Sequence, residues 1–292
     1  MAEVLDQIIK NRRLLRNPYA HMEYLEEFAQ IAASRLKYEN PWAHVEDLDE
    51  LGGLRTPQRA IWQKKKNYTL TEIEERARMI QVKIWQSRTE LWQGMVPSNP
   101  IDILDPTLAL KLIGYDCEVE ETLGQFYSDR KMVEVAGIID GPSKQVRISR
   151  QFPQNVRSFT LAHELGHAIL HEPGIMHRDR ALDGETLSRD PFEIEADKFA
   201  TFFLMPSKLI HSAFKRFFLT DKFVLNEVTA SALGSSAREA QVNGSVTRRQ
   251  LSGMLARAEQ YNGCHFVSLA NQFKVSTGAM AIRLEELELV SK

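Results

Sequence analysis

The chain has 292 residues, more than one domain usually contains, so we expect a catalytic-sized core and at least one smaller unit. Charged residues make up 26 % and hydrophobic residues 43 % of the chain, which is typical of globular proteins and excludes a disordered chain. The net charge of −2 argues against a dedicated nucleic-acid binder. No apolar run approaches the ~20 residues of a membrane span, so we expect a cytoplasmic protein without a membrane partner.

Residues 1–97 predict a helical N-terminal region. Helices are expected at about 4–15, 21–37 and 71–92, the last from apolar residues that recur with a period of 3.6. Thr71 is the expected N-cap of this last helix, with Glu74 completing a capping box. Two prolines, at positions 97 and 100, disfavour helix on both sides and predict a boundary there.

Residues 98–206 predict the catalytic core. A short helix is expected from about 105 to 113, followed by two β-rich runs, 133–140 and 145–152, with a hairpin turn at 141–144. Two helices follow, at about 156–171 and 193–205. Residues 98–205 contain 11 Lys and Arg against 18 Asp and Glu, so this part of the chain is acidic and could attract a basic partner.

The first of these two helices contains the sequence HELGH, which is the HExxH pattern. Its histidines, His163 and His167, are four residues apart, so both imidazoles project from one helical face and can reach one metal ion. Glu164 follows the first histidine and is turned aside from direct ligation, in the position of a base that takes a proton from metal-bound water. The pattern therefore predicts a catalytic metal site.

A catalytic zinc usually has three protein ligands and one open position for water. Glu193, on the second helix, shares its face with small alanines that would allow close approach to the HExxH helix. Glu195 falls with Lys198 on another face as an i,i+3 pair of the kind that is usually solvated. Glu193 is therefore favoured over Glu195 as the third ligand.

Two further polar residues lie near this predicted site. Asp197, one turn after Glu193, is either a hydrogen-bond acceptor for a liganding histidine or a surface charge. His171 lies one turn beyond His167, too far along the axis to join the same ion, and is expected to be buried or to support the ligands. Two histidines and a glutamate form a gluzincin-type site, at which zinc activates water for attack on a peptide carbonyl. Such a site also accepts Mn²⁺.

The stretches RSFTLAHELGHAILH and EIEADKFATFFLMP, with the tail from Phe266, closely resemble the ImmA/IrrE family of zinc metallopeptidases. The resemblance implies that His163, His167 and Glu193 bind zinc and that Glu164 is the base. It also implies a substrate, a helix-turn-helix transcriptional repressor whose cleavage induces stress-response, mobile-element or phage-defence genes. The first 97 residues do not match the helix-turn-helix that is common at the N-terminus of the family.

Residues 207–292 predict a helical C-terminal region with a helix-turn-helix-like unit at 266–290. A DNA-reading helix needs basic or amide side chains, and Arg283 is the one basic residue between Ser276 and Glu288. A structural or repressor-docking role is therefore favoured over nucleic-acid binding. The whole chain is expected to be α+β and mostly helical, with a zincin-like core, a small antiparallel sheet and helical extensions at both ends.

Three functions are compatible with these patterns. The first is a zinc endopeptidase that inactivates a repressor. The second is a non-proteolytic regulatory module that binds a repressor or DNA through the same fold. The third is the active component of a toxin–antitoxin pair.

Overall fold

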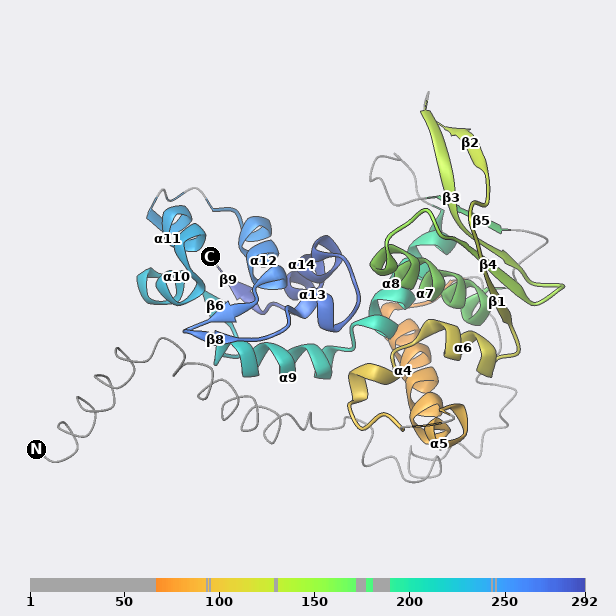
Figure 1. Cartoon of the computed structure of the whole chain (residues 1–292), viewed down its shortest axis with the longest axis horizontal. Coiled ribbons are helices and arrows are strands. Elements are labelled where there is room, and N and C mark those ends of the chain that lie inside the picture. Colours follow the sequence, from red (N-terminus) through yellow and green to blue (C-terminus); the bar gives the residue numbers. More distant parts are fainter. Residues whose placement is uncertain are drawn as a thin grey trace, which may run out of the picture. The chain divides into compact units, whose positions relative to one another are not determined.

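A computed structural model describes residues 67–92, 94, 96–128, 131–171, 177–180, 190–242, 244 and 246–291 (Figure 1). The helices expected at 4–15 and 21–37 lie outside these residues. The fold is mixed α+β, as expected. Among the described residues, no helix is both long and apolar enough to cross a membrane. The domain boundaries expected after residues 97 and 206 stay predictions.

The helix expected from residue 71 begins one residue earlier and is shorter. Helix α4 spans Leu70–Gln86, and the four-residue α5, Arg88–Leu91, follows after a break at Ser87. The expected cap at Thr71 is wrong, because Thr69 is the N-cap and forms the capping box with Glu72. Both threonines precede a glutamate by three residues, and only the position of the first helical residue distinguishes them.

Four of the five strands of the main sheet precede the HExxH helix. The 3₁₀ helix η2 (Pro100–Ile103) and α6 (Pro106–Leu112) lead into β1 (Asp116–Glu120), β2 (Gln125–Ser128), β3 (Lys131–Asp140) and β4 (Gln145–Ser149), and β5 (His177–Arg180) follows later. The order is β1-β4-β3-β2, and β5 also pairs with β3. The expected hairpin joins β3 and β4. The expected antiparallel pairing holds for β2, β3, β4 and β5. Strand β1 departs from it, because it runs parallel to β4.

Two helices pack against each other, and one of them covers the sheet. They are α7 (Gln154–Leu170), which also contacts β3 and β4, and α8 (Pro191–Leu204). A Cβ atom on Gly166 of α7 would lie only 3.0 Å from the Cα atom of Ala196 of α8. The small residues expected to allow this approach therefore do so.

Helix α4 also packs against α8 (Figure 1). The Gln81 side-chain nitrogen donates to the backbone carbonyls of Phe202 and Phe203, at 3.0 Å each. These bonds satisfy carbonyl groups in the last turn of α8 that have no partner within the helix. A segment more than 100 residues earlier in the sequence thus supports the end of the helix that carries Glu193.

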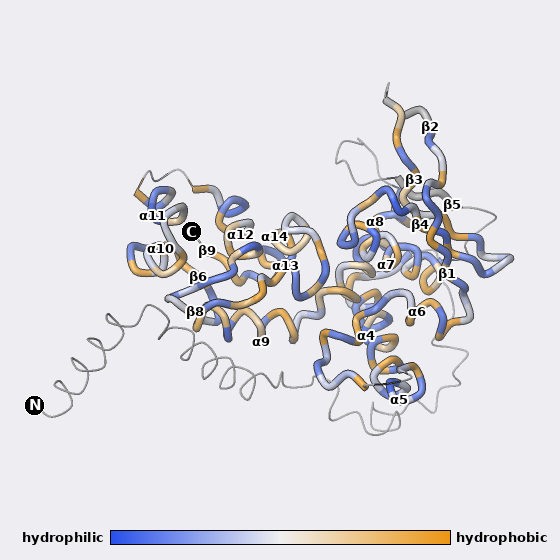
Figure 2. Tube along the Cα trace, viewed as in Figure 1, coloured by the Kyte–Doolittle hydropathy of each residue, from blue (hydrophilic) through white to orange (hydrophobic). Residues whose placement is uncertain are grey.

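The C-terminal region is mainly helical, as expected, with short strand pairs that the sequence did not indicate. The order is α9 (Ser207–Phe218), β6 (Phe223–Val224), α10 (Glu227–Leu233), α11 (Ser235–Val242), α12 (Arg248–Arg257), β7 (Gln260–Tyr261), β8 (Cys264–His265), α13 (Leu269–Gln272), α14 (Thr277–Glu286) and β9 (Val290–Ser291). Hydrophobic and hydrophilic residues alternate along α9 (Figure 2). The apolar face of this helix is buried, and Phe214 and Phe218 form an aromatic core with Phe223.

Candidate metal centre

Helix α7 presents both histidines of the HExxH pattern on one face. His163 is 3 % exposed and His167 is 2 % exposed, and their Nε2 atoms are 2.9 Å apart. The i,i+4 spacing brings the two rings together, with ring centroids 4.7 Å apart. Two nitrogen ligands of the kind that zinc prefers therefore converge on one point.

The first turn of α8 supplies a carboxylate to the same point. Asp190 is the N-cap and accepts a hydrogen bond from the Phe192 backbone nitrogen at 3.0 Å, and Pro191 occupies the first helical position. This start is favourable for a helix, and it places Glu193 in the first turn. The Glu193 Oε2 and Oε1 atoms lie 3.2 Å from His163 Nε2 and 3.5 Å from His167 Nε2.

The protonation state of Glu193 suits metal binding. Burial raises the pKa of this carboxyl, but hydrogen bonds and charge interactions with His163 and His167 outweigh burial and hold the pKa well below its usual range. Glu193 is therefore ionised at neutral pH, as a ligand must be. Its side chain is 26 % exposed, so the site reaches solvent on this side.

The three donor atoms fit a small divalent ion. His163, His167 and Glu193 form a group whose potential ligand atoms all lie within 4.8 Å of one another. Three donors bound tetrahedrally to zinc at about 2.0–2.1 Å are about 3.3 Å apart. The closest separations here, 2.9, 3.2 and 3.5 Å, centre on that value. The donor set also matches a catalytic zinc site of two histidines and one glutamate.

Glu164 lies in a tightly packed position between α7 and the sheet. It is 1 % exposed. A Cβ atom added to Gly137 of β3 would lie 2.9 Å from Glu164 Oε1 and 2.6 Å from the Thr160 side chain. Only glycine therefore leaves room for the Glu164 carboxyl at this point on β3.

Asp197 lies beside the outer nitrogen of one histidine. Its Oδ1 atom is 2.9 Å from His163 Nδ1. A histidine that binds a metal through Nε2 carries its proton on Nδ1, and a carboxylate acceptor there fixes the tautomer and the ring orientation. Of the two interpretations of Asp197 from sequence, this contact favours the hydrogen-bond acceptor.

The expected solvated pair of Glu195 and Lys198 is wrong. Glu195 is only 8 % exposed, and its carboxylate contacts His171 Nε2 at 2.9 Å and accepts the Tyr68 backbone N–H at 2.8 Å. Lys198 pairs with Glu286 of α14 instead. Tyr68 and Glu286 are 127 and 88 residues away from their partners, so helical spacing alone does not reveal these contacts.

His171 is buried, as expected, and belongs to this polar cluster. Its Nδ1 atom lies 3.1 Å from His167 Nδ1. The sequence offered one signal for this contact, the four-residue spacing between the two histidines. It offered none for Tyr68, which lies just before the N-cap of α4, far from His171 in the sequence.

Helices α7 and α8 bring two histidines and one glutamate together beside a second, buried glutamate. This arrangement is typical of a metallopeptidase-like domain. Residues 116–232 match the family model of the IrrE N-terminal-like domain, a peptidase M78 domain. This segment contains α7, α8 and every residue of the candidate metal centre. This part of the chain is therefore similar to the IrrE N-terminal-like domain, which supports the resemblance to the ImmA/IrrE family that the motifs predicted. No curated protein and no solved structure is significantly similar to the chain.

Proposed function

We propose that this protein is a zinc-dependent endopeptidase with a zincin-like core of the gluzincin type. The observation that carries the proposal is the convergence of three ligand atoms from α7 and α8 within 4.8 Å of one another. The match of residues 116–232 to a peptidase M78 domain supports the same activity.

Each polar side chain of the site has a defined role in this proposal. His163, His167 and Glu193 hold the zinc, and Asp197 holds His163 in the tautomer that leaves Nε2 free for the metal. A zinc ion held by these residues would activate a water molecule and would stabilise negative charge on the carbonyl oxygen of the substrate. Glu164 takes the proton from the water and passes it to the leaving amine. Mn²⁺ is compatible with the same ligands.

The proposed substrate is a helix-turn-helix transcriptional repressor, whose cleavage would switch on the genes it controls. The similarity of residues 116–232 to the IrrE N-terminal-like domain supports this choice. The C-terminal unit is proposed to dock the substrate protein and not to read DNA. Arg283, the one basic residue of α14, is 3 % exposed and donates through Nε to the Met205 carbonyl at 3.1 Å. It is therefore engaged inside the protein.

The decisive test replaces the proposed base. Glu164→Gln keeps the size of the side chain and removes its basicity, so we expect zinc to stay bound while repressor cleavage falls by about 10²–10⁴-fold. The full-length protein is incubated with the repressor encoded beside its gene, with and without a chelator, and the fragments are identified by mass spectrometry. Zinc content is measured on the same samples.

Glu118→Gln is the matched control, because Glu118 is an exposed glutamate on β1 and its replacement should leave cleavage unchanged. A Glu164→Gln protein that cleaves at the wild-type rate contradicts the proposal. A wild-type protein that binds the repressor and relieves repression while the repressor stays intact also contradicts it, and supports the non-proteolytic regulatory module.

A further inference from the structure

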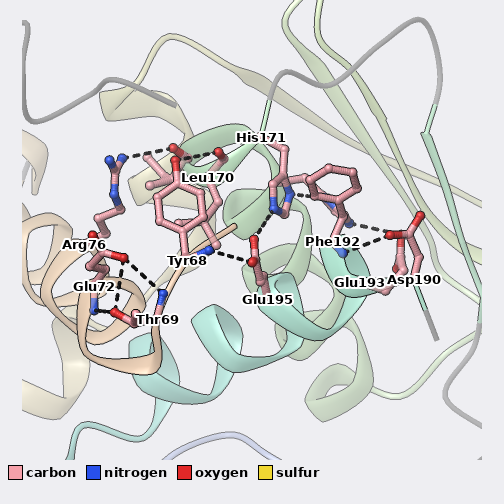
Figure 3. Close-up of polar contacts among 12 residues, drawn as sticks. Tyr68, Thr69, Glu72, Arg76, Leu170, His171, Asp190, Phe192, Glu193 and Glu195 are labelled. Carbon is pink, nitrogen blue, oxygen red and sulfur yellow. Dashed lines mark hydrogen bonds and ion pairs between the residues drawn. The ribbon is translucent and has the colours of Figure 1, made fainter. Parts of the chain in front are cut away.

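A buried series of polar contacts runs from His167 to Tyr68, the residue just before the cap of α4. Figure 3 shows the part of this series from His171 through Glu195 to Tyr68. His167 Nδ1 lies 3.1 Å from His171 Nδ1, and His171 Nε2 lies 2.9 Å from Glu195 Oε2. The other oxygen of Glu195 accepts the Tyr68 backbone N–H at 2.8 Å. His167, His171 and Glu195 are each at most 8 % exposed, so bulk water competes weakly for these bonds.

The direction of each hydrogen bond follows from the metal site. His167 binds the metal through Nε2, so its neutral ring carries the proton on Nδ1 and donates it to His171 Nδ1. His171 then accepts at Nδ1, so it carries its own proton on Nε2 and donates it to Glu195. The Glu195 carboxylate accepts this bond and the bond from Tyr68. Every hydrogen-bond donor in the series from His167 to Tyr68 thus faces an acceptor.

We propose that His171 and Glu195 are positioning residues for the metal ligand His167. The two histidine ligands would then each be oriented by a carboxylate, His163 by Asp197 in direct contact and His167 by Glu195 through the His171 ring. This inference rests on the proposed function only in taking His167 as a metal ligand. It assigns a function to the glutamate that the sequence placed on a solvated face.

Tyr68, at the far end of this series of polar contacts, is itself held in place, as a positioning role for the series requires. The Tyr68 hydroxyl donates to the Leu170 carbonyl at the end of α7, at 2.9 Å. The Arg76 guanidinium of α4 lies 4.8 Å from the centroid of the Tyr68 ring and donates to the Ile169 carbonyl. Tyr68 and Arg76 lie outside the family-matched residues 116–232. An element outside the matched domain therefore fixes the acceptor that orients His167.

The test measures metal binding by the full-length protein and needs no substrate. Glu195→Ala removes the final acceptor, and His171→Leu interrupts the chain with an apolar side chain of similar size. Loss of a group that orients a metal ligand typically lowers metal affinity by about 10–100-fold, and we expect this loss in both variants. Zinc affinity is measured by competition with a chromogenic chelator. The Co²⁺-substituted proteins should show altered visible absorption, because the His167 ring is no longer held.

Rescue separates positioning from a general structural role. His171→Gln restores both an acceptor and a donor in one side chain, so we expect it to recover most of the zinc affinity and the wild-type Co²⁺ spectrum. Glu286→Gln is the control, because it weakens the ion pairs of Glu286 with Lys198 and Arg283 and leaves the polar contacts from His167 to Tyr68 intact. It should leave both readouts unchanged.

The outcomes distinguish this inference from the proposed function. Wild-type zinc affinity and an unchanged Co²⁺ spectrum in folded His171→Leu overturn the positioning role, as does a His171→Gln protein that binds zinc as poorly as His171→Leu. If Glu195→Ala does not fold, the comparison of Leu with Gln at position 171 still decides. A wild-type protein that binds zinc and cleaves no repressor defeats the endopeptidase proposal and leaves the positioning role intact.

Discussion

At the scale of single residues, Gly137 shows how closely the sheet packs against the proposed base. Its hypothetical Cβ would meet Thr160 at 2.6 Å, Glu164 at 2.9 Å and Ile148 at 3.1 Å. Thr160 and Ile148 are both buried in the interior. The absence of a side chain at this point of β3 is therefore a requirement of the site.

Gly137→Ala should destabilise the protein by about 1–3 kcal/mol, the usual cost of inserting a methyl group into a packed core. Denaturant unfolding of the purified variant measures this cost. Adding Thr160→Ala removes the shortest contact and should recover part of the loss. Wild-type stability in the single variant would show that the sheet and α7 can separate at no cost.

The two cysteines, Cys117 and Cys264, should differ strongly in reactivity. Burial raises the pKa of the Cys117 thiol to about 11; the positive charge of Lys111 lowers it, while Asp105 and Asp116 raise it. The thiol therefore stays protonated below that pH, and only about one molecule in a thousand is the reactive thiolate at pH 8. Cys264 is exposed.

Iodoacetamide at pH 8 should thus label Cys264 well before Cys117, and the Cys117 rate should rise about tenfold for each pH unit up to about 10. Peptide mass spectrometry of timed samples gives both rates. Equal labelling rates at pH 8 would contradict the protected environment of Cys117.

At the scale of elements, the metal centre depends on how closely α7 approaches α8. A Cβ on Gly166 would lie 3.0 Å from the Ala196 Cα atom, 3.1 Å from its carbonyl oxygen and 3.2 Å from the Phe199 Cβ atom. Two of these contacts are with backbone, which cannot move without shifting the helix. Two ligands come from α7 and the third comes from α8, so this separation sets the distances between the ligands.

Gly166→Ala should lower zinc affinity, because α8 must move away and carry Glu193 with it. Gly253→Ala is the matched control, since Gly253 also lies in a helix and has no atom within 4 Å of its hypothetical Cβ. That control should gain up to about 1 kcal/mol of stability from helix propensity and bind zinc normally. Equal zinc affinity in the two variants would show that α7 and α8 can accommodate the added methyl group without displacing Glu193.

Sequence periodicity predicted what lies within one helix and missed what depends on another. The His163 and His167 pair is set by one turn of α7, and the choice of Glu193 over Glu195 followed from the face of α8. The same reasoning misplaced Glu195, because its partners His171 and Tyr68 are brought to it by packing. The parallel pairing of β1 was missed for the same reason, since strand order is decided by tertiary contacts.

At the scale of the whole molecule, the C-terminal region is joined to the helix that supplies the third ligand. Arg283 of α14 donates to the Met205 carbonyl at the end of α8, lies 5.0 Å from the centroid of the Phe202 ring and pairs with Glu286. Lys198 of α8 also pairs with Glu286. Helix α8 is thus contacted by α4, α7 and α14, and global unfolding would separate Glu193 from the two histidines.

Zinc should therefore raise the unfolding temperature of the full-length protein, and a chelator should reverse the rise. At a free zinc concentration 100 times the Kd, the expected stabilisation is about 2.7 kcal/mol. His163→Ala should abolish the rise, whereas replacement of the exposed His211 of α9 by Ala should preserve it. Thermal unfolding followed by circular dichroism measures the effect, and an equal rise in both variants would place the zinc elsewhere.

The packing of α4 on α8 determines which truncated fragments of the protein keep the support of the candidate metal centre. A fragment that starts at Asp116, where the family match begins, keeps every proposed zinc ligand. It loses the glutamine amide that binds the last carbonyls of α8 and the backbone nitrogen that holds Glu195. Truncations that begin before Tyr68 retain both, and are the better starting material for biochemistry and crystallisation.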